Sequence, residues 1–264
     1  MVAELGDTRQ LEFNAQYGFA YRCEWGLEGL EALTADSEVV IVVDVLRFTS
    51  AVCCALEAGG VVLPHRWQDD GAAAHAVQHS ATLAGRRELG ELSLSPTDLL
   101  TMPAGTRLVL PSPNGSTIAV RARELGAKHV LAGCLRNASA TALAARQLAD
   151  GGTISVIAAG ERWVSHDGPL RAAVEDLLGA GAILAALDPS LAISAPSCSP
   201  EAAAARAAFN AARPRMYDTL CSCASGRELI DRGWEDDVAT SAAHDVSTTV
   251  CVLVGNEFRA ATAP

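Results

Sequence analysis

The clearest pattern of apolar positions is the uninterrupted β-branched run from Val39 to Val43, which ends at Asp44. The stretch Thr49 to Ala58 then favours a helix, and it is closed by two glycines. An apolar run bounded by polar residues is typical of a strand buried on both faces. This segment therefore predicts a buried strand that leads into a helix.

The same alternation of an apolar run and a helix-like stretch recurs along most of the chain. We expect further strands at 61–63, 108–110, 129–132 and 153–158, and helices at 69–81, 114–125, 137–148 and about 169–187. Alternating strands and helices predict an α/β fold, with a mostly parallel or mixed sheet flanked by helices on both faces.

The last third of the sequence changes character. It favours helices at 201–212, 216–223 and 235–243 before a final strand at 248–254. We interpret residues 1–264 as a single α/β unit with two candidate lobes, a sheet core at 1–188 and a helical portion with the last strand at 201–264. The stretch 189–200, rich in Ser, Pro and Ala, is the expected connection.

Composition excludes several classes of protein. The chain carries a formal net charge of −11, and nucleic acids and anionic membranes attract basic surfaces, so we expect neither as a partner. A small anionic ligand needs only a few local cations. Nearly all basic residues of the chain are arginine, whose planar guanidinium group suits phosphate or sulfonate. The eight cysteines include no Cys-x-x-Cys pair, which argues against zinc. No leader-like or membrane-spanning segment is evident, so we expect a cytoplasmic protein.

Asp44 is expected at the carboxyl end of the most buried strand, the edge of an open α/β sheet where ligands bind. The turn after it brings Arg47 nearby and places the hydroxyls of Thr49 and Ser50 at a helix N-terminus. Asp44 can hold Mg²⁺ there, while Arg47 and free backbone N–H groups hold phosphate oxygens. The alternative is a helix cap with a local pair between Asp44 and Arg47.

A second strand-to-helix junction carries Asn114, Gly115, Ser116 and Thr117. Gly115 allows close backbone approach, and the two hydroxyls stand beside free N–H groups, a combination that suits an anion. The junction is not a P-loop, because the glycine motif that ends in lysine is absent. The alternative is an ordinary turn with a helix cap.

A third junction offers Arg136 as a second cation and Asn137 as a helix cap or ligand. Parallel strands place their carboxyl ends on one side of a sheet. We therefore predict that the turns at Asp44, Asn114 and Arg136 line one cleft, in which the residues of the second and third junctions bind phosphate.

Acidic residues elsewhere offer further metal ligands. Glu175 and Asp176 are adjacent on one predicted helix, and adjacent helical residues point about 100° apart, so we expect only one of them to face the sheet edge and the other to be solvated or capping. Glu235 favours a structural role at a helix start, and the role of Asp237 is left open.

No Ser-His-Asp triad can be assigned, because none of the six histidines has a diagnostic context. His166 and His244 are weak candidates for acid or base catalysis. Cys221 and Cys223 are disfavoured as nucleophiles, because free cysteine is usually a small buried hydrophobe.

Several short motifs follow one another in a specific order and spacing along most of the chain. They are Val43-Asp44-Val45-Leu46-Arg47, Ser95-Pro96, Asn114-Gly115-Ser116, Gly133-Cys134-Leu135-Arg136-Asn137-Ala138, Glu175-Asp176 with Gly179-Ala180-Gly181, Ser225-Gly226-Arg227-Glu228-Leu229, and Gly233-Trp234-Glu235-Asp236-Asp237 with Asp245. This series resembles the 2-phosphosulfolactate phosphatase family.

The resemblance implies an unusual α/β fold, dependence on Mg²⁺, and hydrolysis of 2-phospho-3-sulfolactate to sulfolactate and phosphate, a step of coenzyme M biosynthesis. Two positions depart from the family pattern. Leu94 stands where the family has a polar residue, and Ser225 stands where it tends to carry histidine.

We predict a Mg²⁺-dependent phosphoric monoester hydrolase that acts on a small phosphorylated acid. Asp44 and Arg47 are the expected catalytic residues, and Asp44, with Glu175 or Asp176, is expected to hold the metal. The sequence does not decide between water attack and an aspartyl-phosphate at Asp44, although water attack is slightly favoured. A non-catalytic anion-binding protein is the main alternative, and a nucleotide-dependent transferase is disfavoured by the missing glycine fingerprint. A homodimer is compatible with the sequence.

Overall fold

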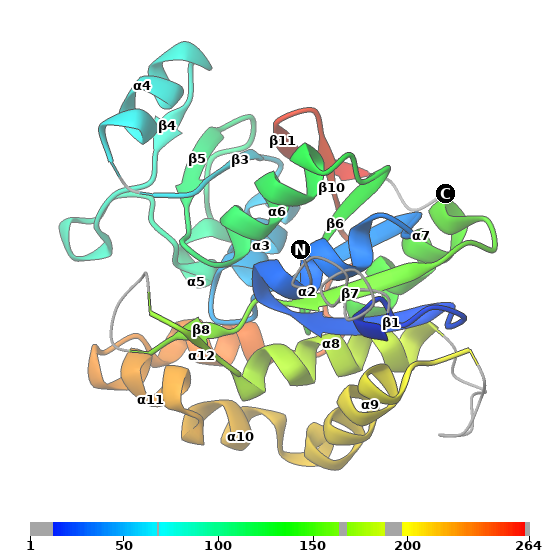
Figure 1. The fold of residues 1–264 in the computed structure, drawn as a ribbon. Coiled ribbons are helices and arrows are strands. Elements are labelled where there is room, and N and C mark those ends of the chain that lie inside the picture. Colours follow the sequence, from blue (N-terminus) through cyan, green and yellow to red (C-terminus); the bar gives the residue numbers. More distant parts are fainter. Residues whose placement is uncertain (1–12, 68, 164–167, 188–196, 262–264) are drawn as a thin grey trace.

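The computed structural model describes residues 13–67, 69–163, 168–187 and 197–261 (Figure 1). The strands are β1 (Tyr21–Trp25), β2 (Val39–Val43), β3 (Val61–His65), β4 (Thr82–Leu83), β5 (Arg107–Pro111), β6 (His129–Gly133), β7 (Ile154–Ala158), β8 (Glu161–Arg162), β9 (Leu170–Arg171), β10 (Val250–Val254) and β11 (Glu257–Ala261). The α-helices are α2 (Gly26–Thr34), α3 (Phe48–Glu57), α4 (Asp70–Gln78), α5 (Pro96–Leu99), α6 (Gly115–Glu124), α7 (Ala138–Ala149), α8 (Val174–Leu187), α9 (Pro200–Ala212), α10 (Met216–Ser222), α11 (Ala224–Asp231) and α12 (Glu235–Ala242).

Nine strands form one mixed sheet in the order β1-β7-β2-β6-β10-β11-β3-β5-β4. The first four are parallel to one another, and so are the last three. The hairpin β10–β11 pairs antiparallel with β6 on one side and with β3 on the other, so the two parallel groups run in opposite directions. The predicted α/β fold with a mixed sheet and a helical C-terminal portion is confirmed.

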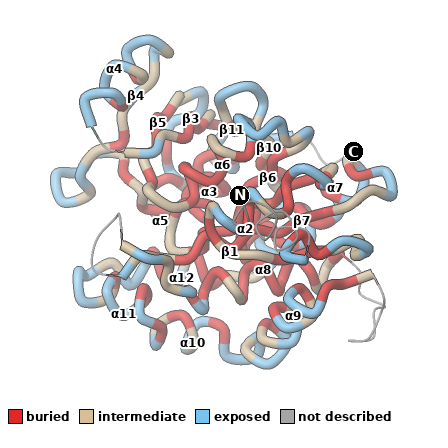
Figure 2. Tube along the Cα trace, in the orientation of Figure 1, coloured by how far each residue is buried: buried red, intermediate tan, exposed pale blue. Residues whose placement is uncertain are grey.

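The sheet encloses α3, in which residues 48–56 are all buried. Strand β2 is buried on both faces, and its side chains alternate between two cores. Val39, Ile41 and Val43 pack with α7 and α8, whereas Val40 and Val42 pack with α2, α3 and α6. Because α3 touches strands of both parallel groups, the twisted sheet curls around it. Figure 2 shows the buried residues concentrated in these central elements, while α4 at the edge is largely exposed.

The C-terminal helices pack against the β1-to-β6 side through α8, and Figure 1 shows α8 to α12 together below the sheet. Contact between α8 and α9 is close because Gly181 has no side chain. A Cβ atom there would lie 2.1 Å from the backbone oxygen of Ala205. The apolar core of this face continues into α10, α11 and α12, so the helical portion packs directly on the sheet.

The structure differs from the sequence-based expectation in several elements. Strands β1, β4 and β11, helices α2, α5 and α11, and the hairpin β8–β9 were not predicted. The helix expected from about Pro169 begins at Val174, because the preceding residues form β9. Most of the expected connection at 189–200 lies outside the described residues. Within the described chain, no helix combines the length and apolar character needed to cross a membrane.

Candidate active site

Asp44 directly follows β2 and is buried, with 6% of its surface exposed. Its Oδ1 accepts a hydrogen bond from the backbone N–H of Phe48 at the start of α3, at 3.2 Å. Its Oδ2 accepts one from the N–H of Gly115 at the start of α6, at 2.9 Å. One carboxylate therefore joins the amino ends of two helices that follow strands of different groups.

The close approach of these two turns requires glycine at position 115. A Cβ atom there would lie 2.7 Å from Oδ2 of Asp44 and 2.4 Å from a ring carbon of Phe48. The neighbouring Asn114 donates from Nδ2 to Oε1 of Glu161 at 3.0 Å. The predicted meeting of the Asp44 and Asn114 turns is confirmed, but the predicted reason is wrong. Strand β5 runs opposite to β2, and the curled sheet brings their ends together.

Helix α8 adds two carboxylates, Glu175 and Asp176, which are 2% and 3% exposed. Asp176 accepts hydrogen bonds from the N–H of Val45 (2.7 Å) and of Gly160 (2.9 Å). Oε2 of Glu175 is buried without a hydrogen-bond partner among the described residues. The expectation that one of the pair is solvated is wrong, because both lie in the first turn of α8, where neighbouring elements cover the helix end.

We call Asp44, Glu161, Glu175 and Asp176 the acidic site. Burial raises the pKa of Asp44 to about 6, and the charges of Glu161 and Glu175 add to the rise against two backbone hydrogen bonds. Burial also raises the pKa of Asp176 well above its ordinary value, together with the charges of Asp44 and Glu175. Among the described residues, none of the four carboxylates forms an ion pair with a basic side chain.

The donor chemistry of the acidic site suits a divalent cation. Carboxylate oxygens are preferred Mg²⁺ ligands, and an oxygen that accepts one N–H keeps a further lone pair. The unpartnered Oε2 of Glu175 is an open ligand position. No three acidic, histidine or cysteine side chains of the described residues already converge on one metal position. Mg²⁺ commonly keeps several waters and binds through one or two carboxylates, so Asp44 and Glu175 fit it.

Arg47 does not pair with Asp44, so that part of the helix-cap alternative is wrong, although Asp44 does accept the N–H of Phe48 at the start of α3. Its Nη1 donates to Oδ2 of Asp237 at 2.7 Å. Asp237 is fully buried and also accepts hydrogen bonds from Nη1 of Arg87 (3.2 Å) and from the hydroxyl of Ser95 (2.6 Å). The residue left open by the sequence therefore anchors two arginines.

Arg87 extends this network to two further carboxylates. It contacts Asp98 at 3.0 Å and Asp236 at 2.5 Å, and these partners raise its pKa above the ordinary value. We call Asp98, Asp236 and Asp237, with Arg47 and Arg87, the arginine-paired cluster. The structure therefore places Arg47 in an ion-pair network with Asp237.

Among the described residues, the hydroxyls of Ser116 and Thr117 make no contact with the acidic site. Ser116 donates to the backbone oxygen of Leu110 at 2.9 Å, which fixes the turn. The hydroxyl of Thr117 is buried and has no partner among the described residues. The structure thus brings Asn114 and Gly115 to the site, while the phosphate-binding role assigned to Ser116 and Thr117 stays a prediction.

The side chains of the third junction have structural partners. Strand β6 ends beside β2, with Gly133 opposite Val43, and Arg136 pairs with Glu57 of α3 at 3.2 Å. The fully buried Asn137 accepts a hydrogen bond from the N–H of Cys134 (2.9 Å) and donates to the backbone oxygen of Thr249 (3.0 Å). Both side chains hold the end of β6 in place. The phosphate-binding role assigned to Arg136 and Asn137 stays a prediction.

The weaker candidates have structural surroundings. His244 stacks on Phe209, with 5.1 Å between ring centroids, and His166 lies outside the described residues. Burial raises the pKa of Cys223 to about 12, which agrees with the low expectation for it as a nucleophile. Glu235 accepts a hydrogen bond from the hydroxyl of Tyr217 at the surface.

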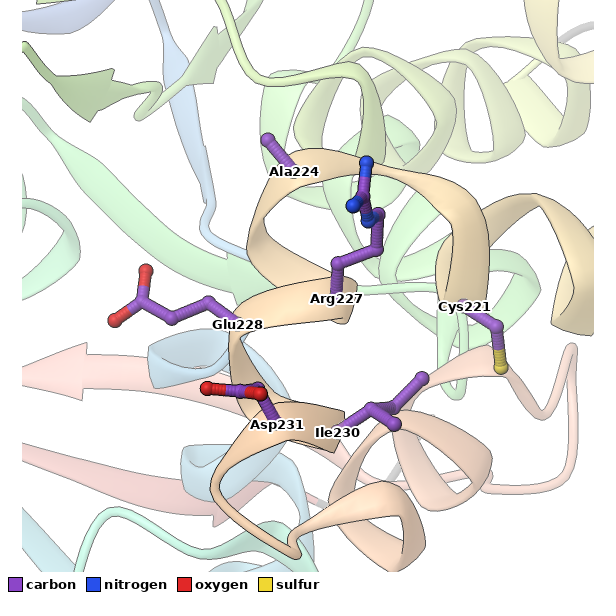
Figure 3. Close-up of a pocket in the computed structure, with 6 residues that line it drawn as sticks. All are labelled: Cys221, Ala224, Arg227, Glu228, Ile230 and Asp231. Carbon is purple, nitrogen blue, oxygen red and sulfur yellow. The ribbon is translucent and has the colours of Figure 1, made fainter.

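A surface groove of about 600 Å³ lies over α10 and α11. Figure 3 shows its lining residues, which are Cys221, Ala224, Arg227, Glu228, Ile230 and Asp231. No residue of the acidic site lines it, and its charged side chains are of both signs. We therefore place the candidate active site at the buried carboxylates rather than in this groove.

Comparison with known proteins identifies the family of the chain. The model of the 2-phosphosulpholactate phosphatase family matches residues 28–256. The chain belongs to this family. It is 33% identical over 226 residues to a probable 2-phosphosulfolactate phosphatase of Thermus thermophilus, covering 83% of this chain and 89% of the relative. It is also 33% identical over 156 residues to the 2-phosphosulfolactate phosphatase of Methanothermobacter thermautotrophicus, covering 58% and 62%. Members of this family are phosphoric monoester hydrolases by name, as the motif series predicted.

The sequence reasoning missed Glu161 as a member of the acidic site. Its strand β8 is two residues long and has no hydrophobic alternation that would predict it. The available signal was its position three residues after an apolar strand, similar to the signal that identified Asp44.

Proposed function

We propose that the chain is a Mg²⁺-dependent phosphatase of small phosphorylated acids, with 2-phospho-3-sulfolactate as its substrate. The observation that carries the proposal is the acidic site, where four carboxylates gather without a basic partner among the described residues. Buried like charges are costly unless a cation or protons compensate them. A protein that keeps such a cluster at the end of a buried strand has a ready place for a metal ion.

Asp44 and Glu175 would hold the metal in this proposal, and Asp176 would support them. Bound Mg²⁺ would neutralise charge on the transferring phosphoryl group. Asp176 positions the other residues, because its two oxygens hold the N–H groups of Val45 after β2 and Gly160 after β7. Asn114 orients Glu161 through its amide, which keeps that carboxylate beside Asp44.

The hydrogen bonds of Asp44 also favour water as the nucleophile. Oδ1 and Oδ2 each accept a backbone N–H, from Phe48 and Gly115. Hydrogen bonds to an anion reduce its nucleophilicity and fix its orientation. We therefore assign the negative charge of Asp44, held in place by these hydrogen bonds, to metal binding. Asp44 does not form a covalent aspartyl-phosphate in this proposal.

The decisive experiment is a phosphate-release screen across small phosphorylated hydroxy acids, with Mg²⁺ or with chelator. The expected result is release from 2-phospho-3-sulfolactate that requires Mg²⁺. Absence of release from all substrates, with retained binding of the same acids, would favour a non-catalytic anion-binding protein instead.

A further inference from the structure

Arg171 of β9 stands directly opposite Glu161 of β8 in the small antiparallel hairpin. Directly opposite residues of an antiparallel pair project from the same face, so Arg171 shares a face with this member of the acidic site. Arg162, next to Glu161 on the same strand, projects from the other face. The hairpin therefore presents one arginine toward the carboxylates and one away from them.

The guanidinium of Arg171 also reaches α11. Its Nη2 donates to the hydroxyl of Ser225 at 3.2 Å, and Ser225 is 9% exposed in the first turn of that helix. Cys223, the N-cap of the same helix, lies close enough to Glu175 for that carboxylate to raise the pKa of its thiol. Arg171 is thus placed near two members of the acidic site, Glu161 across the hairpin and Glu175 beside α11.

Arg171, like Arg162, lacks a carboxylate partner among the described residues, in contrast to Arg47 and Arg136. Arg47 pairs with Asp237 and Arg136 with Glu57, whereas the described residues include no ion-pair partner for Arg171. Its only described side-chain contact is with a neutral hydroxyl. Among the described residues only Nη2 has an acceptor, so the guanidinium has further N–H groups to offer to a ligand.

We propose that Arg171, with the Ser225 hydroxyl, binds the second acid group of the substrate, a carboxylate or a sulfonate. This inference rests on the proposed function. A metal ion can offset repulsion between the phosphate and the acidic site, but a second anionic group on the same small molecule meets the same carboxylates. That group requires its own cation, and a guanidinium fork matches either a carboxylate or a sulfonate. Arg171 is then a specificity residue for acidic phosphate monoesters.

Kinetics of Arg171→Gln and the matched control Arg162→Gln test the proposal with three substrates. These are 2-phospho-3-sulfolactate, 2-phospholactate, which has only the carboxylate, and isopropyl phosphate, which has neither group. For Arg171→Gln we expect KM to rise about tenfold or more for the acidic substrates, with kcat within about threefold. The two acidic substrates distinguish the sulfonate from the carboxylate. Isopropyl phosphate and the control variant should show little change, and Arg171→Lys should fall between the wild type and Arg171→Gln.

An unchanged KM for the acidic substrates would overturn the proposal, and so would an equal loss for isopropyl phosphate, which indicates a general structural effect. Melting temperatures of all variants identify misfolding. If the wild type hydrolyses nothing, calorimetric titration with 3-sulfolactate separates the two inferences. Binding by the wild type that weakens about tenfold in Arg171→Gln supports the anion role without phosphatase activity, whereas equal binding, or none, overturns it.

Discussion

The carboxylates around Asp44 and those around Asp237 have opposite electrostatic surroundings. The acidic site around Asp44 gathers four carboxylates whose described partners are backbone N–H groups, a side-chain amide and a hydroxyl. The arginine-paired cluster around Asp237 has two guanidinium groups for three carboxylates. Burial raises the pKa of Asp44 in the first group, and Arg87 lowers the pKa of Asp236 in the second.

The contrast in pairing distinguishes a candidate binding site, the acidic site, from a structural group of ion pairs, the arginine-paired cluster. Paired charges in the second cluster stabilise the fold and join Arg47 to α12, but they leave little capacity for a ligand. Unpaired charges in the first cluster oppose folding of the metal-free chain and favour binding of a cation. Buried carboxylates without a basic partner are therefore a better indicator of function here than carboxylates paired with arginine. Titratable groups with perturbed pKa values are generally enriched in active sites.

Replacing Asp44 by Asn should give the largest change in activity. Removal of a metal-binding charge is expected to lower phosphate release by about 10²–10³-fold or more. Stabilisation by Mg²⁺ should also disappear, while the metal-free melting temperature stays close to that of the wild type, because a repelled charge and one hydrogen bond are lost together. Phosphate release and melting curves with Mg²⁺ and with chelator measure both effects. A variant that retains wild-type specific activity would remove Asp44 from the site.

Replacing Asp237 by Asn should give the largest change in stability. Arg47 and Arg87 would lose their shared buried partner, which we expect to lower the free energy of unfolding by about 3 kcal/mol. Asp236→Asn is the matched control, because its side chain is 48% exposed and its removal should cost under about 1 kcal/mol. Urea denaturation of both variants measures the difference. Equal losses would contradict the distinction between buried and exposed members of the cluster.

The two clusters should also respond to pH with opposite signs. The pKa of Asp44 is raised in the folded state from 3.8 to about 6, so the metal-free wild type should lose stability as pH rises through that window. The expected loss is on the order of 2 kcal/mol, and Asp176 acts in the same direction. Asp236 has a lowered pKa and contributes a smaller stability that is lost as pH falls below about 4. Urea denaturation in chelator from pH 4 to 7 should show a flatter profile for Asp44→Asn. Parallel profiles would argue against this titration.

Replacing Arg47 by Lys should give the smallest effect. The lysine keeps a charge for Asp237 but loses the fork and the stacking on Trp234, where the guanidinium carbon is 4.7 Å from the ring centroid. We expect kcat/KM to fall about threefold to tenfold with little change in melting temperature. An unchanged kcat/KM would show that Arg47 supports the fold only.

The sequence predicted the position of Asp44 well, because a β-branched run predicts a buried strand and the residue after it must lie at the strand end. It could not predict the partner of Arg47, since Asp237 is 190 residues away and the contact depends on how α12 packs. The meeting of Asp44 with Asn114 was predicted from a parallel sheet that does not exist between these strands. Glu161 was missed because a two-residue strand leaves no periodic pattern.

The hairpin β10–β11 has a consequence for how the chain reaches its native state. It is the only link in the described sheet between the two parallel groups, and it follows all the other strands in the sequence. The acidic site draws Asp44 and Gly115 from junctions in different groups, so it is complete only when this late segment has docked. Such long-range closure makes folding slow. We expect mutations in the hairpin to delay the appearance of activity during refolding more than the appearance of helical signal.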